Sequence, residues 1–148
     1  MRWVLIPALS VLLLAGACKS TTASEKKPNP EIEKFLTSYF ATWSRGDIDA
    51  YGAHFSPKAT ITLIEKGSVQ WVLPLDRFLA TQRHAVKSEK MVERMTSFVA
   101  DVDDVAASAT VQWVLEKKNK KSTGVDRFIL FKDFNGDWLI QSLVFYGD

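Results

Sequence analysis

The sequence predicts an α+β domain in which three N-terminal helices pack on one face of a curved, mostly antiparallel sheet and enclose a cone-shaped hollow. Two observations carry this prediction. The apolar residues follow a helical spacing from residue 31 to residue 43, and the spacing changes to a period of two after Pro57. Helices that come before a run of antiparallel strands are typical of this class.

The first predicted helix starts after Asn29-Pro30 and carries one apolar stripe. Its members are spaced at i, i+3, i+4, i+7, i+8 and i+11, which places them on one face: Ile32, Phe35, Leu36, Tyr39, Phe40 and Trp43. We expect Gly46 to end this helix, because glycine accepts a left-handed conformation, and Asp47 to cap the next one. The Arg-Gly-Asp tripeptide at 45–47 is therefore interpreted as a joint between helices, not as an adhesion signal.

Six strands and a further helix are predicted after this joint. Alternating apolar and polar residues place the strands at 59–64, 68–73, 91–102, 107–117, 123–132 and 137–146. The helix is expected at 74–87, between the second and third strands. Asn135-Gly136 is a strong hairpin signal between the last two strands, and Asn119 marks another hairpin tip.

Residues 1–17 resemble the signal peptide of a bacterial lipoprotein. Arg2 precedes an apolar stretch, 3–14, that is too short to span a membrane. The only cysteine of the chain, Cys18, directly follows Leu-Ala-Gly-Ala, as a lipobox cysteine would. This resemblance implies that Cys18 is acylated and anchors the protein to a membrane. An ordinary secretory peptide with an incidental cysteine is the alternative.

The predicted anchor defines the remaining organisation of the chain. Residues 18–30 are polar and form a tether, and residues 31–148 form one domain. Lys19 stands where some lipoproteins carry an aspartate that retains them in the inner membrane. We therefore expect an envelope protein at the periplasmic face of the outer membrane. A formal net charge of +2 gives no support for nucleic-acid binding.

Two stretches of the domain resemble the nuclear-transport-factor-2-like superfamily, which includes SnoaL-like cyclases and ketosteroid isomerase. They are YFATWSRGDIDAYGAHFSPKATI (39–61) and VDRFILFKDFNGDWLIQSLVF (125–145). The resemblance covers nearly all of residues 31–148 and implies the cone-shaped fold named above. It also implies a homodimer formed through the open face of the sheet. Members of this superfamily include enzymes, ligand-binding proteins and dimerisation modules, so the resemblance alone does not select a function.

The resemblance to ketosteroid isomerase extends to individual positions. Tyr39 and Asp126 match the two hydrogen-bond donors that stabilise an enolate in that enzyme, whereas its proton-moving aspartate matches Leu63. We therefore expect a hollow that lacks a proton-shuttling carboxylate. The candidate ligand contacts are Tyr39, Trp43, Trp113, Asp126 and Phe128.

Each candidate also has a purely structural interpretation. In that case we expect Tyr39 to form a hydrogen bond with the backbone of a strand. We expect Asp126 to form an ion pair with Arg94 or Arg127, and the tryptophans to fill the core. The two histidines, His54 and His84, form no metal-binding cluster, and no cofactor is expected. The lysines at 117, 118, 120 and 121 are interpreted as a solvated turn, with a contact to anionic lipid as the alternative.

These observations favour a lipid-anchored, non-catalytic module that binds a small hydrophobic ligand or a partner protein. The first alternative is an isomerase, cyclase or hydrolase in which Asp126 is the acid and Tyr39 the hydrogen-bond donor. The second alternative is a structural dimer of the envelope without a ligand, which a filled cone would favour.

Overall fold

The computed structural model describes residues 29–147, which form three helices and six strands. The signal peptide and Cys18 lie outside the described residues. The elements, in chain order, are α1 (Pro30–Ser44), α2 (Ile48–Gly52), β1 (Phe55–Glu65), β2 (Ser68–Pro74), α3 (Leu75–Ser88), β3 (Met91–Val102), β4 (Ala106–Lys117), β5 (Lys120–Lys132) and β6 (Trp138–Gly147). Each predicted helix and strand is present, and the main difference is that β1 already begins at Phe55.

The two ends of the first helix are fixed by the predicted residues. The side chain of Asn29 accepts a hydrogen bond from the backbone N–H of Ile32 at 3.2 Å and caps α1. Gly46 follows the helix with φ +74°, a conformation that disfavours a side chain. The carboxylate of Asp47 then accepts from the backbone N–H of Ala50 at 3.1 Å and caps α2. The tripeptide at 45–47 is thus a joint between two helices, as predicted.

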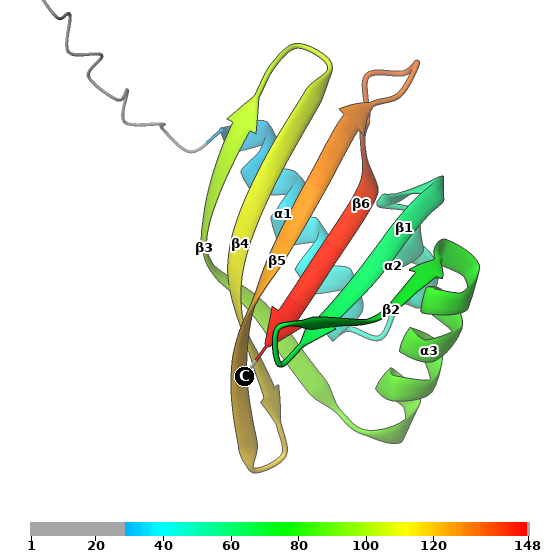
Figure 1. Ribbon diagram of the computed structural model, residues 1–148, viewed down its shortest axis with the longest axis vertical. Coiled ribbons are helices and arrows are strands. Elements are labelled where there is room, and N and C mark those ends of the chain that lie inside the picture. Colours follow the sequence, from blue (N-terminus) through cyan, green and yellow to red (C-terminus); the bar gives the residue numbers. More distant parts are fainter. Residues whose placement is uncertain (1–28, 148) are drawn as a thin grey trace, which may run out of the picture.

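The six strands form one sheet in the order β2-β1-β6-β5-β4-β3. Neighbouring strands are antiparallel except for β1 and β6, which run parallel and place Ile61 beside Leu143. The sheet curves, and the helices lie on its concave side (Figure 1). This confirms the predicted α+β arrangement with a mostly antiparallel sheet.

Alternation along the strands divides the sheet into two faces. In β4 the inward residues are buried, and the outward Ser108 and Gln112 are exposed; the buried ones are Ala107, Ala109, Val111 and Trp113. The apolar stripe of α1 packs against this inner face, with Leu36 fully buried. Sheet and helices together enclose an apolar core that is rich in aromatic side chains.

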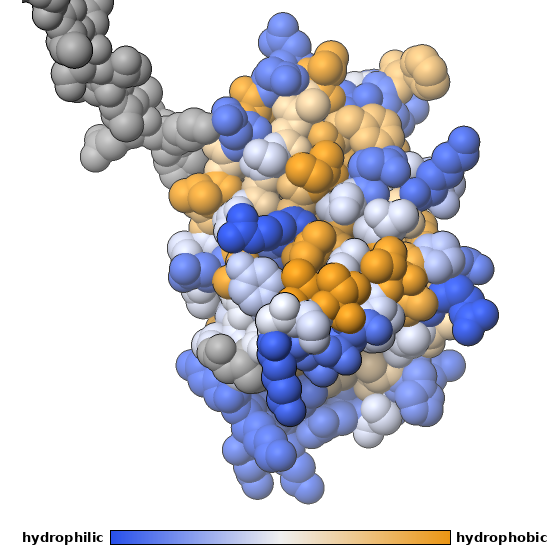
Figure 2. All heavy atoms as spheres, viewed as in Figure 1, coloured by the Kyte–Doolittle hydropathy of each residue, from blue (hydrophilic) through white to orange (hydrophobic). Residues whose placement is uncertain are grey.

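The outer face of the sheet is open in this chain. Figure 2 shows apolar side chains gathered over it among charged ones. Val99 and Ile129 are among the exposed apolar residues, with 66% and 51% of their surfaces accessible. An apolar surface of this kind is typical of contact sites.

The lysine-rich hairpin between β4 and β5 lies at the end of the molecule opposite to the start of α1 (Figure 1). The alternative that its lysines touch lipid beside an anchor stays a prediction, because Cys18 lies outside the described residues. Within residues 29–147, no helix is both long enough and apolar enough to cross a membrane.

Candidate functional site

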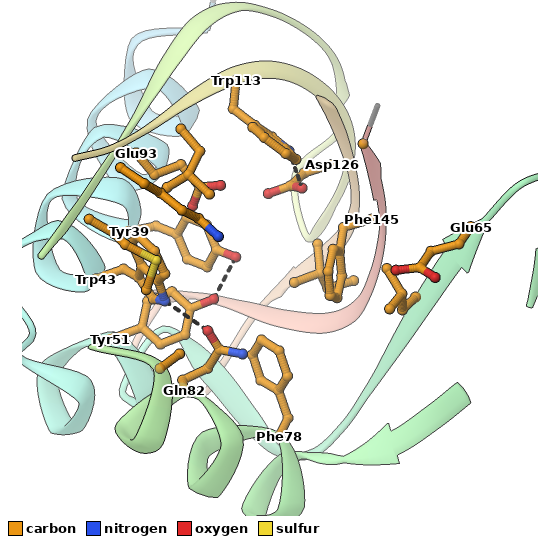
Figure 3. A pocket seen from close by; sticks show the side chains of 17 residues that line it. Tyr39, Trp43, Tyr51, Glu65, Phe78, Gln82, Glu93, Trp113, Asp126 and Phe145 are labelled. Atoms are coloured by element: carbon orange, nitrogen blue, oxygen red, sulfur yellow. Dashed lines mark hydrogen bonds between the residues drawn. The ribbon is translucent and has the colours of Figure 1, made fainter. Parts of the chain in front are cut away.

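A cavity of about 400 Å³ opens between the helices and the inner face of the sheet. This volume falls in the range of small-molecule sites. The helices contribute side chains from α1, α2 and α3, and the strands contribute the facing wall (Figure 3). The polar and aromatic members include Tyr39, Trp43, Tyr51, Gln82, Glu93, Trp113, Asp126 and Phe145. A filled cone would have favoured the ligand-free structural alternative, and this cone contains a cavity.

Asp126 is the most deeply buried acid of the cavity wall, with 4% of its surface exposed. Its Oδ1 accepts a hydrogen bond from Nε1 of Trp113 at 2.7 Å. Burial raises the pKa of Asp126 to about 7, although the indole hydrogen bond acts in the opposite direction. The expected alternative, a pair of Asp126 with Arg94 or Arg127, is not formed in the described part of the chain. Arg94 pairs instead with Glu116 at 2.8 Å, and the Arg127 side chain is exposed on the other face of β5.

Gly124 makes room for the indole that binds Asp126. It lies on β5 directly opposite Trp113, and a Cβ at this position would overlap the ring. The indole therefore lies along β5 and reaches Asp126 two residues further on. The sequence contained a signal for this contact, since a glycine within a strand often marks a close approach.

Tyr39 forms a hydrogen bond with Tyr51 across the helices, and the two hydroxyl oxygens lie 2.8 Å apart. Both side chains are buried, and burial raises the pKa of each tyrosine well above its ordinary value, so both are neutral. Tyr39 thus does not bond a strand backbone, which was the alternative. Phe128 packs edge-on against the Tyr39 ring, with centroids 5.2 Å apart, but it does not line the cavity.

Glu93 brings a second carboxyl into the same cavity, from strand β3. Its side chain has no hydrogen bond or ion pair within the described part of the chain. Burial raises the pKa of Glu93 well above its ordinary value, and the nearby Asp126 carboxyl adds to this effect, while Lys117 opposes it. We expected a hollow that lacks a proton-shuttling carboxylate; the position that matches this carboxylate is Leu63, but Glu93 supplies a second, half-buried carboxyl from another strand.

The end of α1 positions Glu93. Ser44 Oγ accepts a hydrogen bond from the backbone N–H of Glu93 at 2.9 Å and donates to its carbonyl oxygen at 2.9 Å. Every second residue of β3 faces the core in this part of the strand, and these residues are Met91, Glu93 and Met95. An acid between two inward methionines was the sequence signal that could have identified this residue.

The cavity opens where β1, β4 and β6 end. Glu65, Lys117 and Gly147 line it there, and Glu65 is exposed, so these residues form the mouth. Leu63, which matches the base position of ketosteroid isomerase, lines the wall with an apolar side chain, as expected. On the helical side, Trp43 donates its indole N–H to Oε1 of Gln82 at 2.8 Å.

The histidines take no part in this cavity. His54 contacts the carbonyl oxygen of Ala50 at 3.0 Å and Ser38 Oγ at 3.1 Å, and burial lowers its pKa. His84 is exposed on α3. Within residues 29–147 there is no cluster of three or more histidine, cysteine, aspartate or glutamate side chains that could hold a metal ion.

Comparison of the sequence with protein families connects this fold to a known group. The family described as "Putative lumazine-binding" matches residues 27–146, which is most of the chain. The chain belongs to this family. No curated protein matches it in sequence.

Solved structures place this lumazine-binding-family domain in the nuclear-transport-factor-2-like (NTF2-like), or cystatin-like, fold. An NTF2-like protein of unknown function from Shewanella oneidensis is 21% identical, with a TM-score of 0.62 over 78% of this chain and 96% of that one. A protein of unknown function from Mycobacterium tuberculosis is 16% identical, with a TM-score of 0.70 over 80% of this chain and 70% of that one. A "putative dehydratase" of the NTF2-like family from Streptomyces avermitilis is 13% identical, with a TM-score of 0.66 over 80% and 94%. At these identities the likeness shows the fold alone.

We expect Asp126→Asn to flatten the pH dependence of stability. Folding raises the pKa of Asp126 from 3.8 to about 7, so between these values the folded state holds a proton that the unfolded chain has released. This stabilisation is complete below pH 3.8 and is lost as the pH rises towards 7, by an amount on the order of 4 kcal/mol. Urea unfolding from pH 4 to pH 8 measures the free energy of unfolding.

The exposed Asp104 provides the control, because Asp104→Asn removes the same charge from the surface. This control should resemble the wild type, whereas Asp126→Asn should lose the part of the slope that Asp126 contributes and keep the part from Glu93, which has the same direction. Lys117, the charged group near Glu93, is present in all three proteins. Parallel curves for the wild type and Asp126→Asn would contradict the assignment.

Proposed function

We propose that the domain binds a small, largely apolar molecule that carries a polar group. The observation that supports this most directly is the cavity itself. Aromatic and aliphatic side chains form most of its wall, and a few polar groups converge within it. This combination is typical of small-molecule sites, where apolar area gives affinity and polar groups fix orientation.

The arrangement of the polar groups supports binding of one end of a ligand in the interior. Asp126 and the hydrogen-bonded pair of Tyr39 and Tyr51 are buried in the cavity wall, Glu93 is half-buried in the same wall, and Glu65 at the mouth is exposed. Aromatic rings such as Trp113 and Phe145 provide flat surfaces for a planar molecule (Figure 3). The family description, lumazine-binding, is in line with a ligand of this size.

Filling the cavity should abolish binding. Ala85 lines it from α3, whereas Ala80 on the same helix is exposed. We expect Ala85→Trp to weaken binding of the neutral fluorescent probe N-phenyl-1-naphthylamine at least ~10-fold, because the indole occupies the space, and Ala80→Trp to leave it unchanged. Fluorescence titration measures both affinities. Equal binding by the two variants would show that the probe binds elsewhere.

Proton transfer is a second candidate function, and the presence of Glu93 favours it. A carboxylate can accept a proton from a carbon next to a carbonyl group, while a neutral donor stabilises the oxygen that gains charge. Glu93 would act as the base, and Tyr39 and protonated Asp126 as the donors. Because Glu93, Tyr39 and Asp126 all line the same cavity, the three side chains can contact one substrate. The printed name of the Streptomyces avermitilis relative, a "putative dehydratase", describes a reaction of this general class.

This candidate predicts exchange of carbon-bound protons. We expect the protein to accelerate replacement of the α-protons of 2-tetralone by deuterium in D2O, followed by NMR. Glu93→Gln should lower the rate at least ~100-fold, because the amide cannot accept the proton. Glu65→Gln at the mouth is the matched control and should retain the rate. Equal rates with and without protein would exclude this activity on such ketones.

The remaining proposals concern the setting of the domain. An anchor at Cys18 would hold it at the bacterial cell envelope, with the outer membrane favoured. Loss of membrane fractionation in Cys18→Ser tests this. The open face of the sheet, with Val99 and Ile129 exposed, supports a homodimer. A monomeric mass by light scattering at micromolar concentration would contradict it.

A further inference from the structure

The hydrogen-bonding groups inside the cavity are unequally divided between donors and acceptors. The two indole N–H groups of the wall are already used, because Trp43 donates to Gln82 and Trp113 donates to Asp126. In the pair formed by Tyr39 and Tyr51, one hydroxyl donates to the other, so one hydroxyl hydrogen is left. The Gln82 amide uses one of its two N–H groups on Thr81 and, within the described residues, keeps the other.

The acceptors, in contrast, are largely available. Asp126 uses one carboxyl oxygen for the Trp113 indole, and Oδ2 has no hydrogen bond within the described residues. Glu93 uses neither of its carboxyl oxygens in this way. No buried side-chain oxygen or nitrogen lacks a partner in the described part, so the free carboxyl oxygens border the open cavity. They are therefore placed to accept hydrogen bonds from a ligand.

The charged side chains of the cavity are also unequally divided between acidic and basic groups. Lys117 is the one cationic lining side chain in the described chain, whereas three carboxyls line the cavity, those of Glu65, Glu93 and Asp126. Lys117 lies on β4 diagonally across from Glu93 and lowers the pKa of that carboxyl, so of Glu93 and Asp126 only the latter has no cation beside it within residues 29–147. A buried carboxylate is stabilised most by a cation that also donates hydrogen bonds to it. The walls also contain aromatic rings, among them Trp113 and Tyr39, and the π-electrons of aromatic rings attract cations.

We propose that the natural ligand is an organic cation, a small aromatic or aliphatic molecule whose protonated amine binds between Glu93 and Asp126. This inference rests on the proposed binding function and adds the charge class of the ligand. The ammonium group replaces the proton that the carboxyl pair holds in the empty cavity. Its apolar part lies against the aromatic walls towards the mouth.

Three probes of the same shape and different charge test this proposal. They are 1-naphthylmethylamine, a cation, 1-naphthylmethanol, which is neutral, and 1-naphthylacetate, an anion. Isothermal titration calorimetry of the purified protein at pH 7 gives the three affinities. We expect the amine to bind at least ~10-fold more tightly than the alcohol, in line with a charge-assisted hydrogen bond. We also expect it to release protons, measured by comparing buffers of different ionisation enthalpy.

Variants then identify the responsible carboxyls. Glu93→Gln and Asp126→Asn should each weaken amine binding ~10-fold or more and leave the alcohol within ~3-fold, because both replacements preserve shape and remove charge. Asp104→Asn removes an exposed carboxyl that does not line the cavity and should leave amine binding unchanged. Binding of the alcohol in each variant also shows that the cavity is still formed.

The other outcomes overturn the proposal in distinguishable ways. Equal or tighter binding of the alcohol would show that the pocket selects shape and not charge. If 1-naphthylacetate binds more tightly than the amine, and Lys117→Gln removes this preference, Lys117 determines which ligand charge the cavity selects. If none of the three probes binds, the proposed binding function fails together with this inference. If the alcohol binds and the amine does not, only the inference fails.

Discussion

The hydrogen bond from the Trp113 indole to the Asp126 carboxyl determines the form of the cavity. It holds the largest side chain of β4 along β5, where Gly124 leaves room for the ring. The space in front of the sheet therefore stays open and is not filled by the indole. The same bond supplies the buried carboxyl with a partner, without which its burial would be more costly. One contact thus accounts for both the hollow and the acid within it.

Leaving this hollow open and placing two acids in it both lower stability. A well-packed apolar core would avoid the cavity, and leucine in place of either acid would avoid the desolvation of a carboxyl. The surrounding core of α1 and the sheet, with Ile32, Leu36 and Leu130 fully buried, compensates for this cost. Local features that reduce stability in this way are typical of functional sites.

The sequence predicted the elements of the fold well, because each depends on local patterns. The apolar stripe of α1, the joint at Gly46 and the period of two in the strands are all set by neighbouring residues. The candidate site was predicted only in part. Tyr39, Trp43, Trp113 and Asp126 do line one cavity, but Phe128 packs behind the Tyr39 ring.

Glu93 and the pairing of the tyrosines were missed because they depend on long-range geometry. A charged residue in a strand usually faces solvent, and only the inward methionines on either side of Glu93 indicate otherwise. Its position depends on a contact with Ser44, 49 residues earlier. Tyr51 lies on the buried side of α2, but its bond to Tyr39 depends on the angle at which α1 and α2 meet, which no local pattern determines.

The parallel pairing of β1 with β6 has a consequence for how the domain assembles. These strands are far apart in the chain, yet they lie side by side in the middle of the sheet. Until β6 is in place, β1–β2 and β3–β5 are separate units that share no sheet edge. Contacts between distant segments form slowly, because a long loop must close first. A chain in which β6 has not yet joined the sheet therefore has no complete ligand chamber, and ligand present at that stage cannot guide its folding.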